Sequence, residues 1–303
     1  MDSPSLLYYR HSGEFTASGV ILSLFAGLLA TLALGGLYAY IILYCPFVYI
    51  NFFATLFYGC AVGFLGVILL KRQKVRNTQV AITVGLVLGL AAIYAEWVVW
   101  MFGFLGRAEV ERELLGLAVS PATLWALILE VNKVGAWEIK GSSPTGWVLW
   151  LVWGIEAAMI VGASIVAAMS VMDGEPYCES CGTWCTEESN VAEVQACEPA
   201  VLKQRVESKD MGFLETLGAR AADASDWLQV KLHKCRQCGM TNTLTVDSVN
   251  VTVDKKKKET KKTETVLEKL LVTPAECERI QQIGRKFASV TASPAIGTSM
   301  PQT

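Results

Sequence analysis

GWVLWLVWGIEAAMIVGASIVAAMSVMDGEPYCESCG, residues 146–182, joins a long apolar segment to a pair of cysteines with only a short hinge between them. Residues 146–172 contain one charged side chain, Glu156. At about 1.5 Å of rise per helical residue, this segment is long enough to cross a hydrocarbon layer of about 30 Å. Cys178 and Cys181 follow after the hinge at 173–176. The stretch therefore predicts a membrane span that leads directly into a candidate metal-binding motif.

The composition divides the chain at the same place. Of the 303 residues, 52% are hydrophobic and 18% are charged, whereas a soluble domain has about 25% charged residues. The 172 residues before Asp173 contain 9 basic and 9 acidic side chains, and the remaining 131 contain 17 and 19. We therefore expect a lipid-soluble block over 1–172 and a water-soluble tail. The nearly neutral tail argues against nucleic acid as a partner.

Three further apolar runs precede the first stretch, at 17–44, 48–70 and 78–104. Cys45-Pro46 ends the first of them, because proline disfavours helical backbone in the residue before it. Only a few residues separate the first two runs, so they should form an antiparallel hairpin. With the run at 146–172, the sequence predicts an all-α bundle of four helices in the lipid bilayer.

The orientation of these spans follows from the basic segment Lys71–Arg76, which has four positive charges in six residues and no acid. Such a segment stays in the cytoplasm by the positive-inside rule. Counting outward from it, the N-terminus and the tail are expected on the cytoplasmic side of a cytoplasmic or inner membrane. The turn at 45–47 and the segment 105–145 are expected outside.

The outer segment contains a predicted helix of its own over 121–134. Ser120 is a good N-cap, Pro121 suits the first helical position, and Gly135 is a stop signal. At 14 residues the helix is too short to span a bilayer. It is either an interfacial or re-entrant helix anchored by Trp125 and Trp137, or a cap on the bundle.

Small residues recur at four-residue spacing within the spans. Such rows allow helix backbones to approach closely in lipid. They indicate either packing inside one four-helix subunit or a face for a homo-oligomer or another membrane subunit. The residues concerned are Gly59 with Gly63, Gly85 with Gly89, and Gly154, Ala158 and Gly162.

Two acids, Glu96 and Glu156, lie within predicted spans. A carboxylate in lipid is costly, so it should face the bundle interior or water. Counted from the outer side, both acids lie about one-third of the way into their antiparallel spans, so they could face each other. They are either an ion or proton site, or structural groups that hydrogen-bond a Trp or Tyr or are buried in protonated form.

The tail contains two copies of the pattern Cys-x-x-Cys-Gly, at Cys178 to Gly182 and at Cys235 to Gly239. Two such hooks have the spacing of a four-thiolate zinc site. We therefore expect Cys178, Cys181, Cys235 and Cys238 to hold structural zinc in a reducing compartment.

The hooks resemble those of zinc-ribbon proteins, in which the glycine after the second cysteine lets backbone N–H groups turn toward sulfur. The resemblance covers 176–254 and implies a small cytoplasmic α+β domain with a closed metal shell. The 53 residues between the hooks exceed the compact family pattern, and Cys185 and Cys197 are spare candidate ligands. A thioredoxin-like redox pair is the rival interpretation. His233 is interpreted as an ordinary strand residue.

Helical patterns at 199–208 and 211–222 predict a helical insert between the hooks. Alternating strands are predicted on both sides of the second hook, at 226–234 and 241–253. These elements define a zinc-ribbon domain over 173–254. The lysine-rich residues 255–262 are interpreted as a solvated hairpin tip or linker rather than a lipid- or nucleic-acid-binding patch. A charged linker and a last helix, opened by a capping box at Thr273 to Glu276, are predicted over 255–290, and 291–303 is expected to be disordered.

The sequence contains neither a glycine-rich phosphate loop nor the metalloprotease or serine-hydrolase motifs. We therefore expect a non-enzymatic membrane protein whose zinc-ribbon module serves assembly or partner binding. The alternative is a channel or transporter subunit with a path at Glu96 and Glu156.

Overall fold

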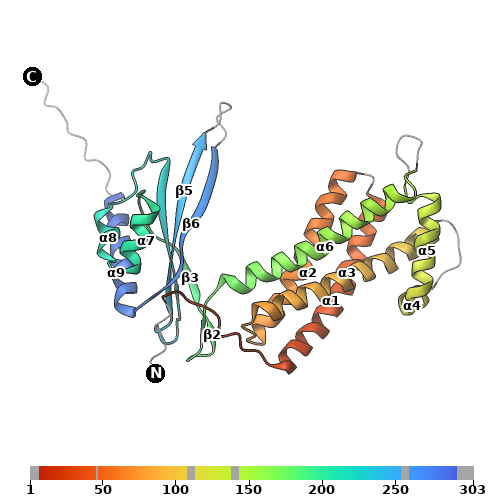
Figure 1. Ribbon diagram of the computed structural model, residues 1–303, viewed down its shortest axis with the longest axis horizontal. Helices are drawn as coiled ribbons and strands as arrows, with labels where there is room; N and C mark the ends of the chain where they lie inside the picture. Colours follow the sequence, from red (N-terminus) through yellow and green to blue (C-terminus); the bar gives the residue numbers. More distant parts are fainter. Residues whose placement is uncertain (1–6, 46, 108–112, 138–142, 254–258, 292–303) are drawn as a thin grey trace, which may run out of the picture. The chain divides into compact units, whose positions relative to one another are not determined.

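The computed structural model describes residues 7–45, 47–107, 113–137, 143–253 and 259–291. The chain forms two compact units, Ser12–Gly174 and a second unit that combines the N-terminal residues up to His11 with Glu175–Thr303. The first is built from long helices and the second around an antiparallel sheet (Figure 1). The predicted disordered segment, apart from Thr291, lies outside the described residues.

Four helices of the first unit are long and apolar enough to cross a membrane. Each coincides with a predicted span to within about three residues at either end, and Glu156 and Glu96 lie in two of them. The agreement arises because a span is defined by an uninterrupted apolar length rather than by local propensity. The four helices are α1 (Ala17–Tyr44), α2 (Val48–Arg72), α3 (Thr78–Arg107) and α6 (Trp147–Gly174).

Glycines in α2 and α3 bring both helices against the backbone of α6. A Cβ placed on Gly59 would lie 2.6 Å from the Ile160 carbonyl oxygen, and one on Gly63 would overlap the backbone of Ser164. On α3, a Cβ on Gly89 would lie 3.2 Å from the Val161 Cα. These glycines therefore pack helices together within one chain.

Gly85 of α3 follows the same pattern, since a Cβ there would lie 3.2 Å from the Ala168 Cβ, and its carbonyl accepts a 2.8 Å hydrogen bond from Ser164. The row on α6 behaves differently. A Cβ on Gly154 or Gly162 would meet nothing within 4 Å. The prediction of close packing thus applies to α2 and α3, whereas the α6 row lies on an open face.

The short helices α4 (Leu114–Val119) and α5 (Pro121–Val134) complete the first unit. Leu124, Ile128 and Val131 of α5 are buried in an apolar cluster with residues of α3, α4 and α6. Trp125 is 54% exposed and contacts Trp150 at 5.5 Å between ring centroids. The helix therefore caps one end of the bundle while presenting an exposed aromatic ring, which an interfacial helix also requires.

The second unit contains a four-stranded antiparallel sheet in the order β3-β4-β5-β6 and a separate two-stranded hairpin, β1-β2. Three helices accompany the sheet, α7 (Pro199–Glu207), α8 (Gly212–Thr216) and α9 (Pro274–Thr291). Eighteen buried residues from the sheet and these helices form one apolar core. The strands are β1 (Tyr177–Cys178), β2 (Thr183–Trp184), β3 (Thr186–Gln195), β4 (Asp226–Lys234), β5 (Asn242–Val253) and β6 (Glu259–Val272).

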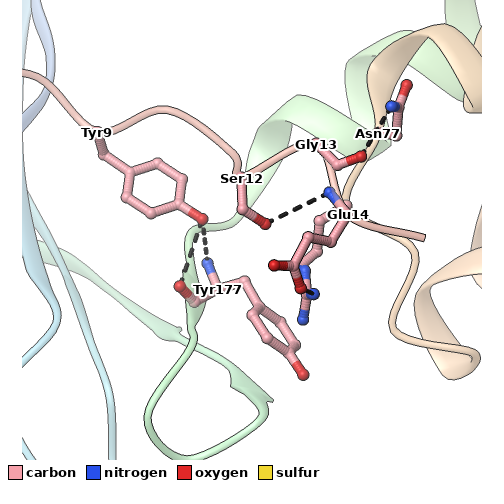
Figure 2. A network of polar contacts seen from close by, with 7 residues as sticks. Tyr9, Ser12, Gly13, Glu14, Asn77 and Tyr177 are labelled. Carbon is pink, nitrogen blue, oxygen red and sulfur yellow. Dashed lines mark hydrogen bonds and ion pairs between the residues drawn. The ribbon is translucent and has the colours of Figure 1, made fainter.

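Residues 7–9 lie along the edge of β6, so the N-terminus belongs to the sheet domain rather than to the predicted block 1–172. Tyr9 donates its backbone N–H to Lys269 at 2.9 Å, and Leu271 donates to Leu7 at 3.0 Å. Figure 2 shows the Tyr9 hydroxyl at the backbone of Tyr177, where it accepts from the N–H at 2.8 Å and donates to the carbonyl at 3.3 Å. The segments that precede α1 and follow α6 are thereby joined.

Within the helical unit, the basic segment before α3 contacts the chain ahead of α1. Asn77 donates its side-chain amide to the Gly13 carbonyl at 2.8 Å (Figure 2). Arg76 forms an ion pair with Glu14 and also donates its backbone N–H to the Glu14 carbonyl at 2.9 Å. These bonds fix the approach of the chain to the first helix.

Two sequence predictions for the tail require correction, and one strand was not predicted. Residues 186–195 form β3, for which the sequence analysis assigned no element, and 259–272 form β6, where a charged linker was expected. The predicted helix at 211–222 is reduced to α8, because Gly218 has a left-handed backbone with φ of 78°. The predictions for β4, β5, α7 and the capping box of α9 are confirmed, with Thr273 N–H donating to Glu276 at 2.7 Å.

We expect Gly63→Ala to destabilise the helical unit by about 1–3 kcal/mol, because the added methyl overlaps the α6 backbone. Gly36→Ala is the matched control, since a Cβ on Gly36 of α1 would meet nothing within 4 Å. Thermal unfolding of both variants in detergent measures the difference. Equal stability of the two variants would contradict the packing assigned to Gly63.

Candidate metal centre

The two predicted hooks form the tips of two hairpins in the sheet domain. The first lies between β1 and β2, where Cys178 pairs with Thr183 across the hairpin. The second lies between β4 and β5, where Lys234 pairs with Asn242. Each hook is therefore held at its base by a strand pair, which is why the alternating sequence on both sides of the second hook was informative.

The backbone turns in the same way in both hooks. Gly182 donates its N–H to the Cys178 carbonyl at 2.8 Å, and Gly239 donates to the Cys235 carbonyl at 2.9 Å. Both glycines have left-handed backbones, with φ of 65° and 64°. This conformation costs an L-residue with a side chain roughly 1–2 kcal/mol, so glycine is the residue that the turn requires.

The four hook cysteines converge. Their sulfur atoms all lie within 4.8 Å of one another, and the Sγ atoms of Cys178 and Cys238 are 3.6 Å apart. Metal–sulfur bonds of about 2.3 Å at tetrahedral angles would place neighbouring sulfurs about 3.8 Å apart. All four cysteines are free thiols. The arrangement can therefore hold one metal ion in a four-thiolate shell.

The second hook favours ionised sulfur. Burial opposes ionisation of Cys235, but hydrogen bonds from the backbone N–H groups of Cys238 and Gln237 outweigh it and lower the pKa of the thiol to about 6. The Met240 N–H, 3.4 Å from the Cys238 sulfur, lowers the pKa of that thiol as well. By contrast, the hydrogen bond to Cys238 raises the pKa of Cys181 to about 12. A bound cation would replace the remaining protons.

The spare candidate ligands separate into two kinds. Cys185 is buried against the hook cysteines, yet its sulfur is directed to the Thr241 carbonyl at 3.7 Å. Burial, as the largest cause, raises the pKa of Cys185 to about 12. Cys197 packs instead against the apolar core of the sheet. His233 is a buried strand residue outside the group of four, with its Nε2 3.9 Å from Glu187.

The predicted pair of intramembrane acids forms a second candidate site, in the helical unit. Glu96 and Glu156 lie close enough to interact electrostatically. Tyr38 of α1 is hydrogen-bonded to Glu156 and, at 2.7 Å, to Thr55 of α2. The expected hydrogen bond between a buried acid and a tyrosine is thus confirmed for Glu156. The role of Thr55 was not predicted, although a threonine within an apolar span was the available signal.

Comparison of the chain with protein-family models, with curated proteins and with solved structures gave no match. The resemblance of the tail to zinc ribbons therefore stays a prediction. The structure shows two hooks with left-handed glycines and four converging sulfurs.

Because all four thiols converge, Cys178→Ser should reduce the bound metal from about one ion per chain to near zero. Cys185→Ser is the control, since that thiol lies beside the group without belonging to it. Metal analysis of the purified full-length chain measures both. Equal metal content in the two variants would exclude the four-cysteine site.

Proposed function

We propose that this chain is a membrane-anchored protein in which a zinc-bound module, exposed to the cytoplasm, serves assembly or partner binding. The observation that carries the proposal is the convergence of four cysteine sulfurs at the tips of two hairpins, in a chain with four helices of membrane-spanning length. Four thiolates around a tetrahedral ion form a closed shell, which suits a structural rather than a catalytic metal.

Zinc is the metal that best fits this donor set. Four cysteine thiolates in a tetrahedral arrangement select zinc or iron–sulfur chemistry over magnesium and calcium, which prefer oxygen ligands. Two hooks with left-handed glycines are the arrangement of structural zinc knuckles. A reducing compartment keeps such thiols available for the metal.

Zinc would mainly stabilise the first hook, Cys178 to Gly182. The sheet has its own core of eighteen buried residues, so its folding does not rest on the metal as that of a minimal ribbon does. The hairpin β1-β2 has two residues per strand and cannot be stable by itself. In sequence, only Glu175 and Pro176 separate it from α6. Zinc would therefore fix the part of the domain that adjoins the membrane anchor in the chain.

The cytoplasmic assignment is supported by two observations. Residues 7–9 pair with β6, so the chain before α1 and the chain after α6 belong to one domain. Four crossings return the chain to the side on which it started. The basic segment Lys71–Arg76, between the spans of α2 and α3, supports a cytoplasmic location for this side by the positive-inside rule.

A test of this orientation uses two exposed positions. We expect Lys262→Cys to resist a membrane-impermeant maleimide in intact cells and to react in inverted vesicles, and Glu130→Cys to show the opposite pattern. Lys262 and Glu130 have side chains 74% and 66% exposed, and the parent chain supplies the background from its native cysteines. Labelling of Lys262→Cys in intact cells would overturn the assignment.

The proposed role in assembly draws on surfaces that the fold leaves open. On α6, the space around Gly154 and Gly162 is unfilled. At the second hook, Met240 is 67% exposed. The β5-β6 hairpin also extends beyond β4, because the pairing of β4 with β5 ends at Asn250 whereas that of β5 with β6 continues to Val253.

We expect the full-length chain in mild detergent to have a mass above that of one 33.0 kDa chain, as a homo-oligomer or with a co-purifying subunit. Cys178→Ser should reduce this assembly if the zinc-bound module takes part in it. Native mass spectrometry measures both, with Cys185→Ser as the control. A monomeric parent without a second subunit would contradict the proposed role.

A further inference from the structure

A cluster of polar side chains occupies the interior of the four-helix unit, and each of the four long helices contributes to it. Tyr38 comes from α1, Thr55 and Tyr58 from α2, Glu96 from α3 and Glu156 from α6. The first four are each at most 7% exposed. The rings of Tyr38 and Tyr58 stack with centroids 4.5 Å apart and an interplanar angle of 13°.

Close helix contacts hold this cluster in place. A Cβ on Gly35 of α1 would lie 2.9 Å from the Tyr58 hydroxyl and 3.3 Å from the Glu96 backbone nitrogen. The Tyr58 hydroxyl donates to the Ala92 carbonyl of α3 at 3.0 Å, one helical turn before Glu96. Glycine at position 35 thus allows α1 to approach both the tyrosine and the acid.

The hydrogen bonds in the cluster require more protons than its hydroxyl groups carry. Three oxygen–oxygen contacts follow one another, from Glu156 to Tyr38, from Tyr38 to Thr55 at 2.7 Å, and from Thr55 to the Asn51 carbonyl at 2.8 Å. A hydroxyl has one proton and the carbonyl has none. If Glu156 is ionised, Tyr38 donates to it, and Thr55 must then divide one proton between two acceptors.

A proton on Glu156 removes this shortage. The carboxyl group then donates to Tyr38, Tyr38 donates to Thr55, and Thr55 donates to the Asn51 carbonyl, so that each contact has its own proton. The chain of donors runs from α6 through α1 to α2. A proton on Glu156 also avoids an ionised carboxylate in hydrocarbon, which is costly.

Glu96 supplies the second, independent observation. Its Oε2 is buried and has no hydrogen-bond partner among the residues that the structure describes. The carboxyl group interacts electrostatically with Glu156, Tyr38 and Tyr58. The apolar runs 17–44, 48–70, 78–104 and 146–172 contain no Lys, Arg or His. Among the described residues, the titratable groups that interact with this carboxyl are the other acid and the two tyrosines.

We propose that Glu96 and Glu156, together with Tyr38, form an intramembrane proton-binding site in which the two carboxyl groups hold exchangeable protons. The ligand is the proton rather than a metal cation, because Glu156 requires a hydrogen to complete its chain of donors. Proton binding at this site does not depend on the zinc-bound module. It is also the first requirement of a transport path through these two acids.

Infrared difference spectroscopy of the full-length chain in liposomes tests the proposal without a transport assay. At about pH 7 the parent should show the carbonyl stretch of protonated carboxyl groups, which ionise in exposed glutamate near pH 4.3. Glu156→Gln and Glu96→Gln should each remove one component of this band. Glu130→Gln is the control, because Glu130 is exposed and paired with Lys133 at 2.6 Å, and it should leave the band unchanged.

Two measurements keep the test decisive if a glutamine variant fails to fold. Tyr38→Phe should shift the Glu156 component to higher frequency, because the carboxyl group loses its hydrogen-bond acceptor. In the parent, the band should be insensitive to added sodium, potassium or calcium. Absence of the band at about pH 7, or its loss on addition of one of these cations, would overturn the proposal.

Discussion

The convergence of four cysteine sulfurs within 4.8 Å ties together the two hooks of the sheet domain. Thiolates at such separations repel one another unless a cation lies between them, so the hooks can remain together in ionised form only around a metal. The backbone of each hook makes the turn that brings its two cysteines together with a left-handed glycine, Gly182 or Gly239. Because the metal would fix the hooks in space, the 53 residues between them are free to build other elements. They form β2, β3, α7, α8 and β4.

This arrangement divides stability between two sources. The apolar core between the sheet and its helices contains none of the hook cysteines, whose own buried cluster is separate. Gly284 of α9 lies so close to the Val191 carbonyl of β3 that a side chain there would overlap it. The sheet is thus stabilised by packing, whereas the short first hairpin would gain its stability from a bound metal. The expected structural zinc would therefore act on the hooks rather than on the whole tail.

The helices and strands that were predicted correctly from the sequence are those that a single physical signal determines. The four long helices follow from apolar length, and the α9 start follows from a capping box. Sequence reasoning failed at β3 and β6, because the first residues of each strand are exposed and polar on both faces and show no alternation. Their extended backbone is determined by pairing with β4 and β5. The depth of Glu96 and Glu156 in their spans could be counted from the sequence. Their hydrogen-bond partners could not be predicted, because these depend on how each helix is rotated about its axis. Tyr38 and Glu156 are 118 residues apart, so no local sequence pattern indicates their contact.

In the helical unit, α2 and α3 close against α6. Glycines of α2 and α3 contact it between Ile160 and Ala168, starting one turn after Glu156. Such backbone contacts leave no room for gradual sliding, because close-packed interfaces resist small displacements. Exchange of a proton at Glu156 would therefore be accommodated by side-chain rearrangement at Tyr38 and Thr55 rather than by movement of α6. The close packing and the polar cluster therefore depend on each other. The closely packed helices fix the position of the carboxyl group, and its hydrogen-bond partners can change rotamer around it.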